Sequence, residues 1–195
     1  DSRGNSCEEA EYAEISFKKG IPVALDGEPK SFHEIINAMN ELAGKHGFGR
    51  IDMIENRLIG VKSREVYEVP GALTLITAHK ALEDLCLERE VLHYKLGVEQ
   101  KWAELVYNGM WFSPLKEALD GFIETTQQLV TGDVRLRFFK GSCVTVGRRS
   151  PYSLYDYDLA TYDASDSFDH AAAKGFIELH GLPVTVWARQ RRKMG

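Results

Sequence analysis

The amino-acid sequence predicts an α+β fold, with a largely antiparallel sheet, packed helices and a C-terminal oligomerisation arm. Its strand-like segments occur in adjacent pairs, rather than alternating singly with helices as in a doubly wound parallel sheet. Between these pairs lie stretches in which apolar residues recur at helical spacing. The length of 195 residues and the hydrophobic share of 44% suit one domain with a substantial core.

The first half of the sequence carries clear start and stop signals. Residues 1–11 are mostly polar, which is typical of a linker leading into a domain. Apolar positions in residues 12–17 and 21–25, on either side of a glycine-containing turn, predict two paired strands. Ser31 and Glu34 have the spacing of a capping box, and apolar residues then recur at helical spacing over residues 32–43.

The middle of the sequence predicts two further strand pairs and the helices between them. Residues 50–68 are expected to form two charged strands. Pro70 opens a long helical pattern that runs to Leu96, and we expect Gly97 to interrupt it. A serine and proline at 113–114 start another helix, and alternation over residues 134–146 around a glycine turn predicts a β-hairpin.

The C-terminal part is expected to end in an arm. A last helical part begins near His170, and Pro183 is expected to break it. Residues 182–195 contain apolar residues followed by a basic cluster, which suits an arm that packs on a neighbouring subunit. The basic residues could meet a polyanion, or could complement a helix C-terminus or an acidic patch on a partner. The cluster consists of Arg189, Arg191, Arg192 and Lys193.

The composition excludes several classes of function. The formal net charge of -5 argues against nucleic-acid binding, which needs a clustered basic surface. No apolar run approaches the roughly 20 residues that a membrane-spanning helix needs, so no membrane partner is expected. Cys7, Cys86 and Cys143 are odd in number and widely spaced, so neither a disulfide framework nor a zinc site is predicted. This cysteine usage suits a cytoplasmic protein.

The most informative segment is the charged strand pair within residues 49–71. Acidic and basic residues alternate there with Ile and Val, where a buried strand would be apolar. One interpretation is a strand pair with a solvated, salt-bridged face. The other is a site for a zwitterionic ligand, whose ammonium needs a carboxylate and whose carboxylate needs a cation. Glu55 and Tyr67 are the sharpest candidates, because a carboxylate can hold an ammonium and a phenol can donate a hydrogen bond.

Three ordered motifs resemble the argininosuccinate synthase family, over residues 12–181. They are IDMIENRLIGVKSREVYEVPGA from Ile51, preceded by AGKHGFGR; KWAELVYNGMWFSP from Lys101; and KGSCVTVGRRSPYSLY from Lys140. The resemblance implies that Glu55 and Tyr67 contact citrulline. Arg57, Lys62 and Arg64 are second-rank candidates, which could orient Glu55 or face phosphate, or could form structural salt bridges. No catalytic residue and no metal ligand is assigned to this chain.

The resemblance also implies an activity. Enzymes of this family join citrulline and aspartate at the expense of ATP, giving argininosuccinate, AMP and pyrophosphate, with magnesium at the nucleotide. The Ser-Gly-Gly-Leu-Asp-Thr-Ser nucleotide loop of the family does not occur in this sequence. We therefore expect residues 12–181 to be a synthetase catalytic and multimerisation domain of a homotetramer, which alone binds no ATP. The alternative is a non-catalytic oligomerisation or amino-acid-binding module.

Six histidines form no metal-binding pair, which argues against a zinc site. The segment from Tyr155 to Asp169 is rich in Asp and Tyr. It could offer carboxylates to a divalent cation, but it lacks the regular spacing of a calcium loop and is more typical of a solvated loop.

Overall fold

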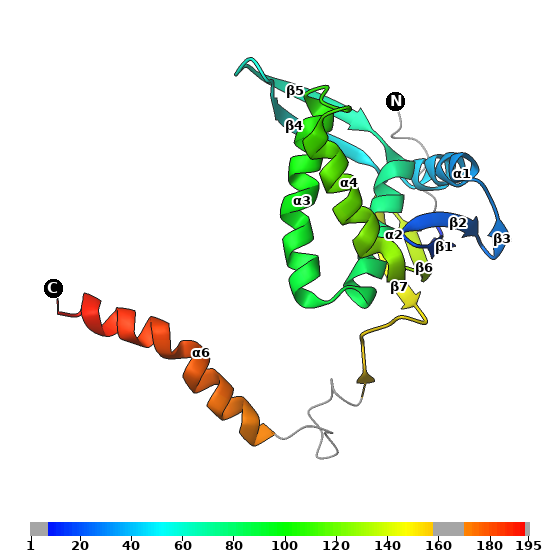
Figure 1. The fold of residues 1–195 in the computed structure, drawn as a ribbon. Coiled ribbons are helices and arrows are strands. Elements are labelled where there is room, and N and C mark those ends of the chain that lie inside the picture. The colour runs from blue at the N-terminus through cyan, green and yellow to red at the C-terminus, as the bar shows by residue number, and fades with distance from the viewer. Residues whose placement is uncertain (1–7, 158–169, 194–195) are drawn as a thin grey trace. The chain divides into compact units, whose positions relative to one another are not determined.

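The computed structural model describes residues 8–157 and 170–193 (Figure 1). The chain divides into two compact units, Asp1–Leu154 and Tyr155–Gly195. The boundary between the two units therefore lies before the last described helix, which begins at His170. The predicted boundaries of the main domain at residues 12–181 and of the arm at 182–195 stay predictions, and residues 1–7 of the predicted linker lie outside the described part.

A five-stranded antiparallel sheet forms the centre of the first unit, with the strand order β3-β2-β1-β6-β7. The strands are β1 (Glu11–Lys18), β2 (Ile21–Leu25), β3 (Glu28–Pro29), β6 (Gly132–Phe139) and β7 (Ser142–Arg149). In the central pair, Ile15 lies opposite Val134 and both side chains are fully buried. Strand alternation places every second residue of β1 and β6 in the core, so the predicted α+β class with antiparallel pairing is confirmed.

Two helices pack on this sheet and complete the core. Helix α1 (Phe32–Lys45) begins at Ser31 with the predicted capping box, because the Ser31 side chain accepts from the Glu34 amide and the Glu34 side chain accepts from the Ser31 amide. Helix α2 (Pro70–Cys86) follows with proline in its first turn. The helices contribute buried side chains that contact the sheet residues, among them Ile35, Met39, Ala43, Leu75, Ala78 and Leu82.

Helices α3 (Arg89–Tyr107) and α4 (Pro114–Thr126) form a helical hairpin, followed by the short 3-10 helix η1 (Gln127–Leu129). The expected break at Gly97 is wrong, because α3 runs through it. The break lies instead at Leu87 and Glu88, where the Glu88 carboxylate accepts from two amides of the next turn and caps α3. Gly97 faces open space, so a helix tolerates it there at a modest cost.

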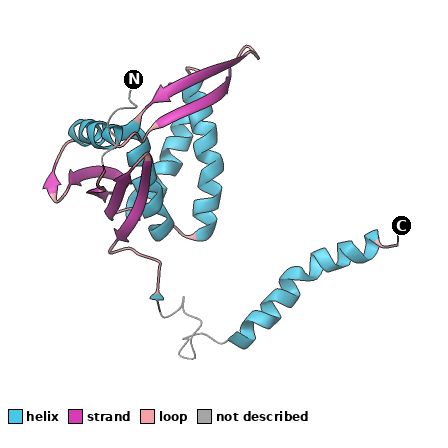
Figure 2. Cartoon of the chain, turned by 180° about the vertical axis from the view of Figure 1, so that it is seen from behind, coloured by secondary structure: helices cyan, strands magenta, loops and turns pink. Residues whose placement is uncertain are grey.

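Strands β4 (Arg50–Asn56) and β5 (Lys62–Glu68) form a separate two-stranded sheet, which extends away from the larger sheet (Figure 2). Glu55 lies opposite Ser63, and Ile51 lies opposite Tyr67. Gly60 makes the connecting turn possible with a φ of 85°. The hairpin lies beside the adjoining ends of α3 and α4 (Figures 1 and 2).

The second unit contains one described helix, α6 (His170–Arg191). The prediction that Pro183 would break this helix is wrong, because α6 continues through it. A proline removes one backbone hydrogen bond, which can kink a helix without ending it. The Thr185 hydroxyl also donates to the Gly181 carbonyl at 3.0 Å. The large apolar side chains of α6 are about half or more exposed: Phe176, Ile177, Leu179, Leu182, Val184, Val186 and Trp187.

Candidate functional site

Glu55 is the most unusual residue of the β4–β5 hairpin, because it is buried on a sheet whose other charged residues are largely exposed. Its exposed fraction is 8%. Side chains alternate between the faces of a sheet, so the observed register places Glu55, Met53 and Ile51 on one face together with Ser63 and Tyr67 of β5. Local alternation and the strand register therefore bring Glu55 and Tyr67 to the same surface.

Two phenols hold the Glu55 carboxylate. The Tyr67 hydroxyl donates to Oε1, and the Tyr107 hydroxyl donates to Oε2 at 3.0 Å. Tyr67 comes from β5 of the same hairpin, whereas Tyr107 is the last residue of α3. A carboxylate has about four acceptor positions, so both oxygens can still accept from a ligand.

Arg57 is the cation of this cluster. Its Nε lies 3.8 Å from the Glu55 Oε2 and donates to the Ser63 hydroxyl at 2.9 Å, and its Nη2 donates to Glu65 at 2.8 Å. The hydrogen bond from Tyr67 is the main reason that the pKa of Glu55 is lowered. Burial opposes this effect, while Tyr107 and Arg57 add to it.

The same hydrogen bonds act in the opposite direction on the phenols. Their bonds to Glu55, together with burial, raise the pKa of Tyr67 and of Tyr107. At neutral pH the cluster therefore holds an ionised carboxylate and two neutral donors. Such an arrangement can accept hydrogen bonds from an ammonium or a ureido group, both at the carboxylate and at the phenol oxygens.

The structure does not bring the other two second-rank residues to this cluster. The register places Lys62 and Arg64 on the opposite face of the hairpin. Lys62 donates there to Asn56 at 2.6 Å, and the Arg64 Nε donates to Asp52 at 2.9 Å. Of the second-rank residues, only Arg57 contacts Glu55.

Sequence reasoning missed Tyr107. The residue lies within the second motif, KWAELVYNGMWFSP, but 52 positions separate it from Glu55. No local pattern relates a helix end to a strand so far away. The only signal was that this motif and the charged strands both carry the family resemblance.

Comparison of the sequence with known proteins identifies its family. The model described as "Arginosuccinate synthase C-terminal domain" matches residues 2–187. The chain belongs to this family. A protein named argininosuccinate synthase from Symbiobacterium thermophilum is 61% identical over 181 residues, which are 93% of this chain and 45% of that protein.

Further relatives carry the same name. Argininosuccinate synthase of Thermosynechococcus vestitus is 60% identical over 94% of this chain and 46% of its own length. The Bacillus pumilus protein is 62% identical over 90% of this chain and 44% of its own length. The chain thus spans about half the length of the curated relatives it matches.

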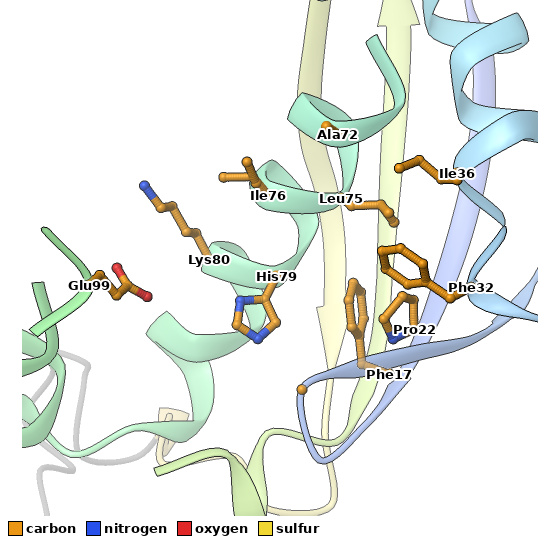
Figure 3. Close-up of a pocket in the computed structure, with 11 residues that line it drawn as sticks. Phe17, Pro22, Phe32, Ile36, Ala72, Leu75, Ile76, His79, Lys80 and Glu99 are labelled. Atoms are coloured by element: carbon orange, nitrogen blue, oxygen red, sulfur yellow. The ribbon is translucent and has the colours of Figure 1, made fainter. Parts of the chain in front are cut away.

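The first unit also contains an apolar groove of about 490 Å³ between β1–β2, α1 and α2 (Figure 3). Phe17, Pro22, Phe32 and Leu75 gather on one side of it, while His79, Lys80 and Glu99 bring polar groups on the other (Figure 3). Neither Glu55 nor Tyr67 lines this groove. It carries no nucleophile and base in contact, so it offers no evident chemistry.

Within residues 8–157 and 170–193, no three acidic, histidine or cysteine side chains form a group that could hold a metal ion. Residues 158–169 of the Asp- and Tyr-rich segment lie outside the described part, so its two interpretations stay open. Cys86 and Cys143 are free thiols, of which Cys86 belongs to the core and Cys143 packs against it. None of the described helices is long and apolar enough to cross a membrane.

Proposed function

We propose that this chain supplies the citrulline-binding part of an ATP-dependent ligase, which joins citrulline and aspartate to give argininosuccinate, AMP and pyrophosphate in arginine biosynthesis. Membership of the family and the shared name of the relatives support this activity. The observation that carries it is the buried Glu55 carboxylate, fixed between two phenols at the hairpin. A salt-bridged surface strand would have no reason to bury a carboxylate in this way.

In this proposal Glu55 and Tyr67 anchor citrulline so that its ureido oxygen points toward the nucleotide. That oxygen attacks the α-phosphorus of ATP and releases pyrophosphate, and the aspartate amine then displaces AMP from the citrullyl-adenylate. The contribution of Glu55 and Tyr67 is alignment: they hold one reactant in a fixed orientation while charge develops elsewhere. Arg57 offsets part of the negative charge of Glu55 and Glu65.

ATP and magnesium are assigned to the complete enzyme. The described residues of this chain do not fit either group, because they contain no phosphate-binding loop and no cluster of carboxylates for Mg²⁺. Aspartate is likewise assigned to the complete enzyme rather than to a described residue of this chain.

The test is Glu55→Gln in the complete enzyme, with AMP formation measured as a function of citrulline concentration. Loss of the charged acceptor should raise the citrulline KM on the order of tenfold to a hundredfold. Asp52→Asn is the matched control, because Asp52 is an acidic residue of the same strand on the opposite face. An unchanged citrulline KM and kcat in Glu55→Gln would contradict the proposal.

A specific observation also favours an oligomerisation role. Helix α6 exposes nearly all of its large apolar side chains, and such a surface usually marks a protein interface. We propose that the predicted arm, residues 182–195, packs on a neighbouring subunit of a homotetramer. Deletion of these residues should lower the oligomeric mass measured by light scattering. An unchanged mass would contradict a role of the arm in oligomerisation.

Two further questions are whether the isolated chain binds citrulline and where in the cell it is located. Citrulline binding by the 195-residue chain, measured by calorimetry without ATP, would favour the amino-acid-binding module over the dependent ligase part. The free thiols of Cys86 and Cys143 support a cytoplasmic location, where cysteines stay reduced.

A further inference from the structure

The structure assigns Tyr107 as a positioning residue of the citrulline site: its hydroxyl fixes the Glu55 carboxylate in the orientation that receives the ligand. This inference rests on the proposed function and adds a residue from a different element to it. Tyr107 ends α3, whereas Glu55 and Tyr67 belong to the hairpin. The site is therefore built where the helical hairpin meets the β-hairpin.

The hydrogen-bond geometry explains why two phenols are needed. Tyr67 contacts only Oε1 of Glu55, so this bond alone leaves the carboxylate free to turn about it. Tyr107 contacts Oε2 at 3.0 Å and removes that freedom. The remaining lone pairs then point in fixed directions, available to an ammonium or to ureido N–H groups.

Arg57 cannot replace Tyr107 in this role. Its Nε lies 3.8 Å from Oε2, beyond hydrogen-bond distance, and the same nitrogen already donates to the Ser63 hydroxyl. Its Nη2 donates to Glu65. Without the Tyr107 hydroxyl, Oε2 would keep only a more distant ionic contact.

The end of α3 is held firmly enough for Tyr107 to act in this way. The amides of Asn108 and Met110 donate to the carbonyls of Glu104 and Leu105 at 2.9 and 2.8 Å, and these bonds close the helix end. Two side-chain contacts with α4 add to this: the Trp102 indole of α3 donates to Asp120 at 2.7 Å, and the Lys116 ammonium lies 3.8 Å from the ring centroid of Trp111 in the loop. Within α4, Lys116 also pairs with Asp120 at 2.8 Å.

The titration of Glu55 provides a readout that a merely structural role would not move. The groups that face its carboxylate are Tyr67 and Tyr107, which donate to it, and Arg57, which Glu65 partly neutralises. Because the hydrogen bond from Tyr107 helps to lower the pKa of Glu55, its removal should raise that pKa. The acid limb of the kcat/KM profile for citrulline should then move to higher pH.

The experiment compares Tyr107→Phe with Tyr94→Phe in the complete enzyme. Tyr94 lies on the same helix, is 68% exposed and packs against Phe122, so it controls for the loss of a phenol from α3. We expect Tyr107→Phe to raise the citrulline KM several-fold, with the ATP KM unchanged and the acid limb shifted upward. Tyr94→Phe should change none of these quantities.

Combination with Glu55→Gln separates this inference from the proposed function. If Tyr107 acts through Glu55, adding Tyr107→Phe to Glu55→Gln should raise the citrulline KM no further.

If Glu55→Gln weakens citrulline binding but Tyr107→Phe behaves like Tyr94→Phe, the positioning role is wrong and the proposed function stands. If Tyr107→Phe raises the KM without moving the acid limb, or adds fully to Glu55→Gln, the positioning role is also overturned. If Glu55→Gln itself has no effect, the proposed function fails.

Discussion

Replacement of Lys95 by methionine should strongly destabilise the chain. The Lys95 ammonium lies 2.9 Å from the Glu83 carboxylate, and the two side chains are only 3% and 4% exposed. After the replacement Glu83 keeps a hydrogen bond from Gln127 at 2.6 Å, and the His79 ring stays 3.8 Å away. An uncompensated buried charge of this kind typically costs about 3–5 kcal/mol of unfolding free energy.

Urea unfolding of the 195-residue chain, followed by circular dichroism, measures this cost. With a slope of about 2 kcal/mol per molar urea, the transition midpoint should fall by roughly 2 M. Lys101→Met is the matched control on the same helix. Lys101 pairs with Glu104 at 2.9 Å, but both side chains are about half exposed, so its loss should cost about 1 kcal/mol or less.

A second variant tests whether the unpaired charge of Glu83 causes this loss of stability. Glu83→Gln combined with Lys95→Met removes both buried charges and keeps an oxygen that can accept from Gln127; the other partner of Lys95, Glu99, is 35% exposed and can be solvated. Most of the lost stability should return, because a buried pair replaced by neutral groups is often nearly neutral in free energy. If Lys95→Met costs no more than Lys101→Met, or if the double variant is no more stable than Lys95→Met, the reasoning is refuted.

Three further predictions follow from the local geometry. Gly49 has a φ of 107°, and a Cβ there would lie 2.2 Å from the Pro70 backbone, so Gly49→Ala should cost roughly 2 kcal/mol or more in urea unfolding. Gly60→Ala, in open space, should cost only about 1 kcal/mol, and equal costs would contradict this argument. Burial raises the pKa of the Cys143 thiol to about 11, so about one thiol in a thousand is ionised at pH 8. Iodoacetamide should modify Cys143 only after unfolding, and rapid labelling of the native chain in mass spectrometry would refute this. Ser31→Ala should cost about 1 kcal/mol in urea unfolding, because it removes the cap of α1, and an unchanged midpoint would speak against the capping box.

Local signals in the sequence predicted much of the fold. The strand pairs of the larger sheet followed from apolar alternation, and the start of α1 followed from the Ser31–Glu34 capping box. These features depend on residues only a few positions apart. The breaks expected at Gly97 and Pro183 were wrong. A residue that disfavours a helix only adds to the free energy of the helical conformation, and favourable interactions of neighbouring residues can offset that cost.

The sequence by itself determined the α+β class, the family resemblance and the candidates Glu55 and Tyr67. Tertiary structure decided which groups surround Glu55. The strand register turned Lys62 and Arg64 to the face opposite Glu55, whereas Arg57, two residues after Glu55, lies beside it by local alternation. The packing of α3 against the β-hairpin added Tyr107. Register and helix packing depend on burial between segments far apart in the chain, and no pattern within one segment encodes which distant side chain will meet it.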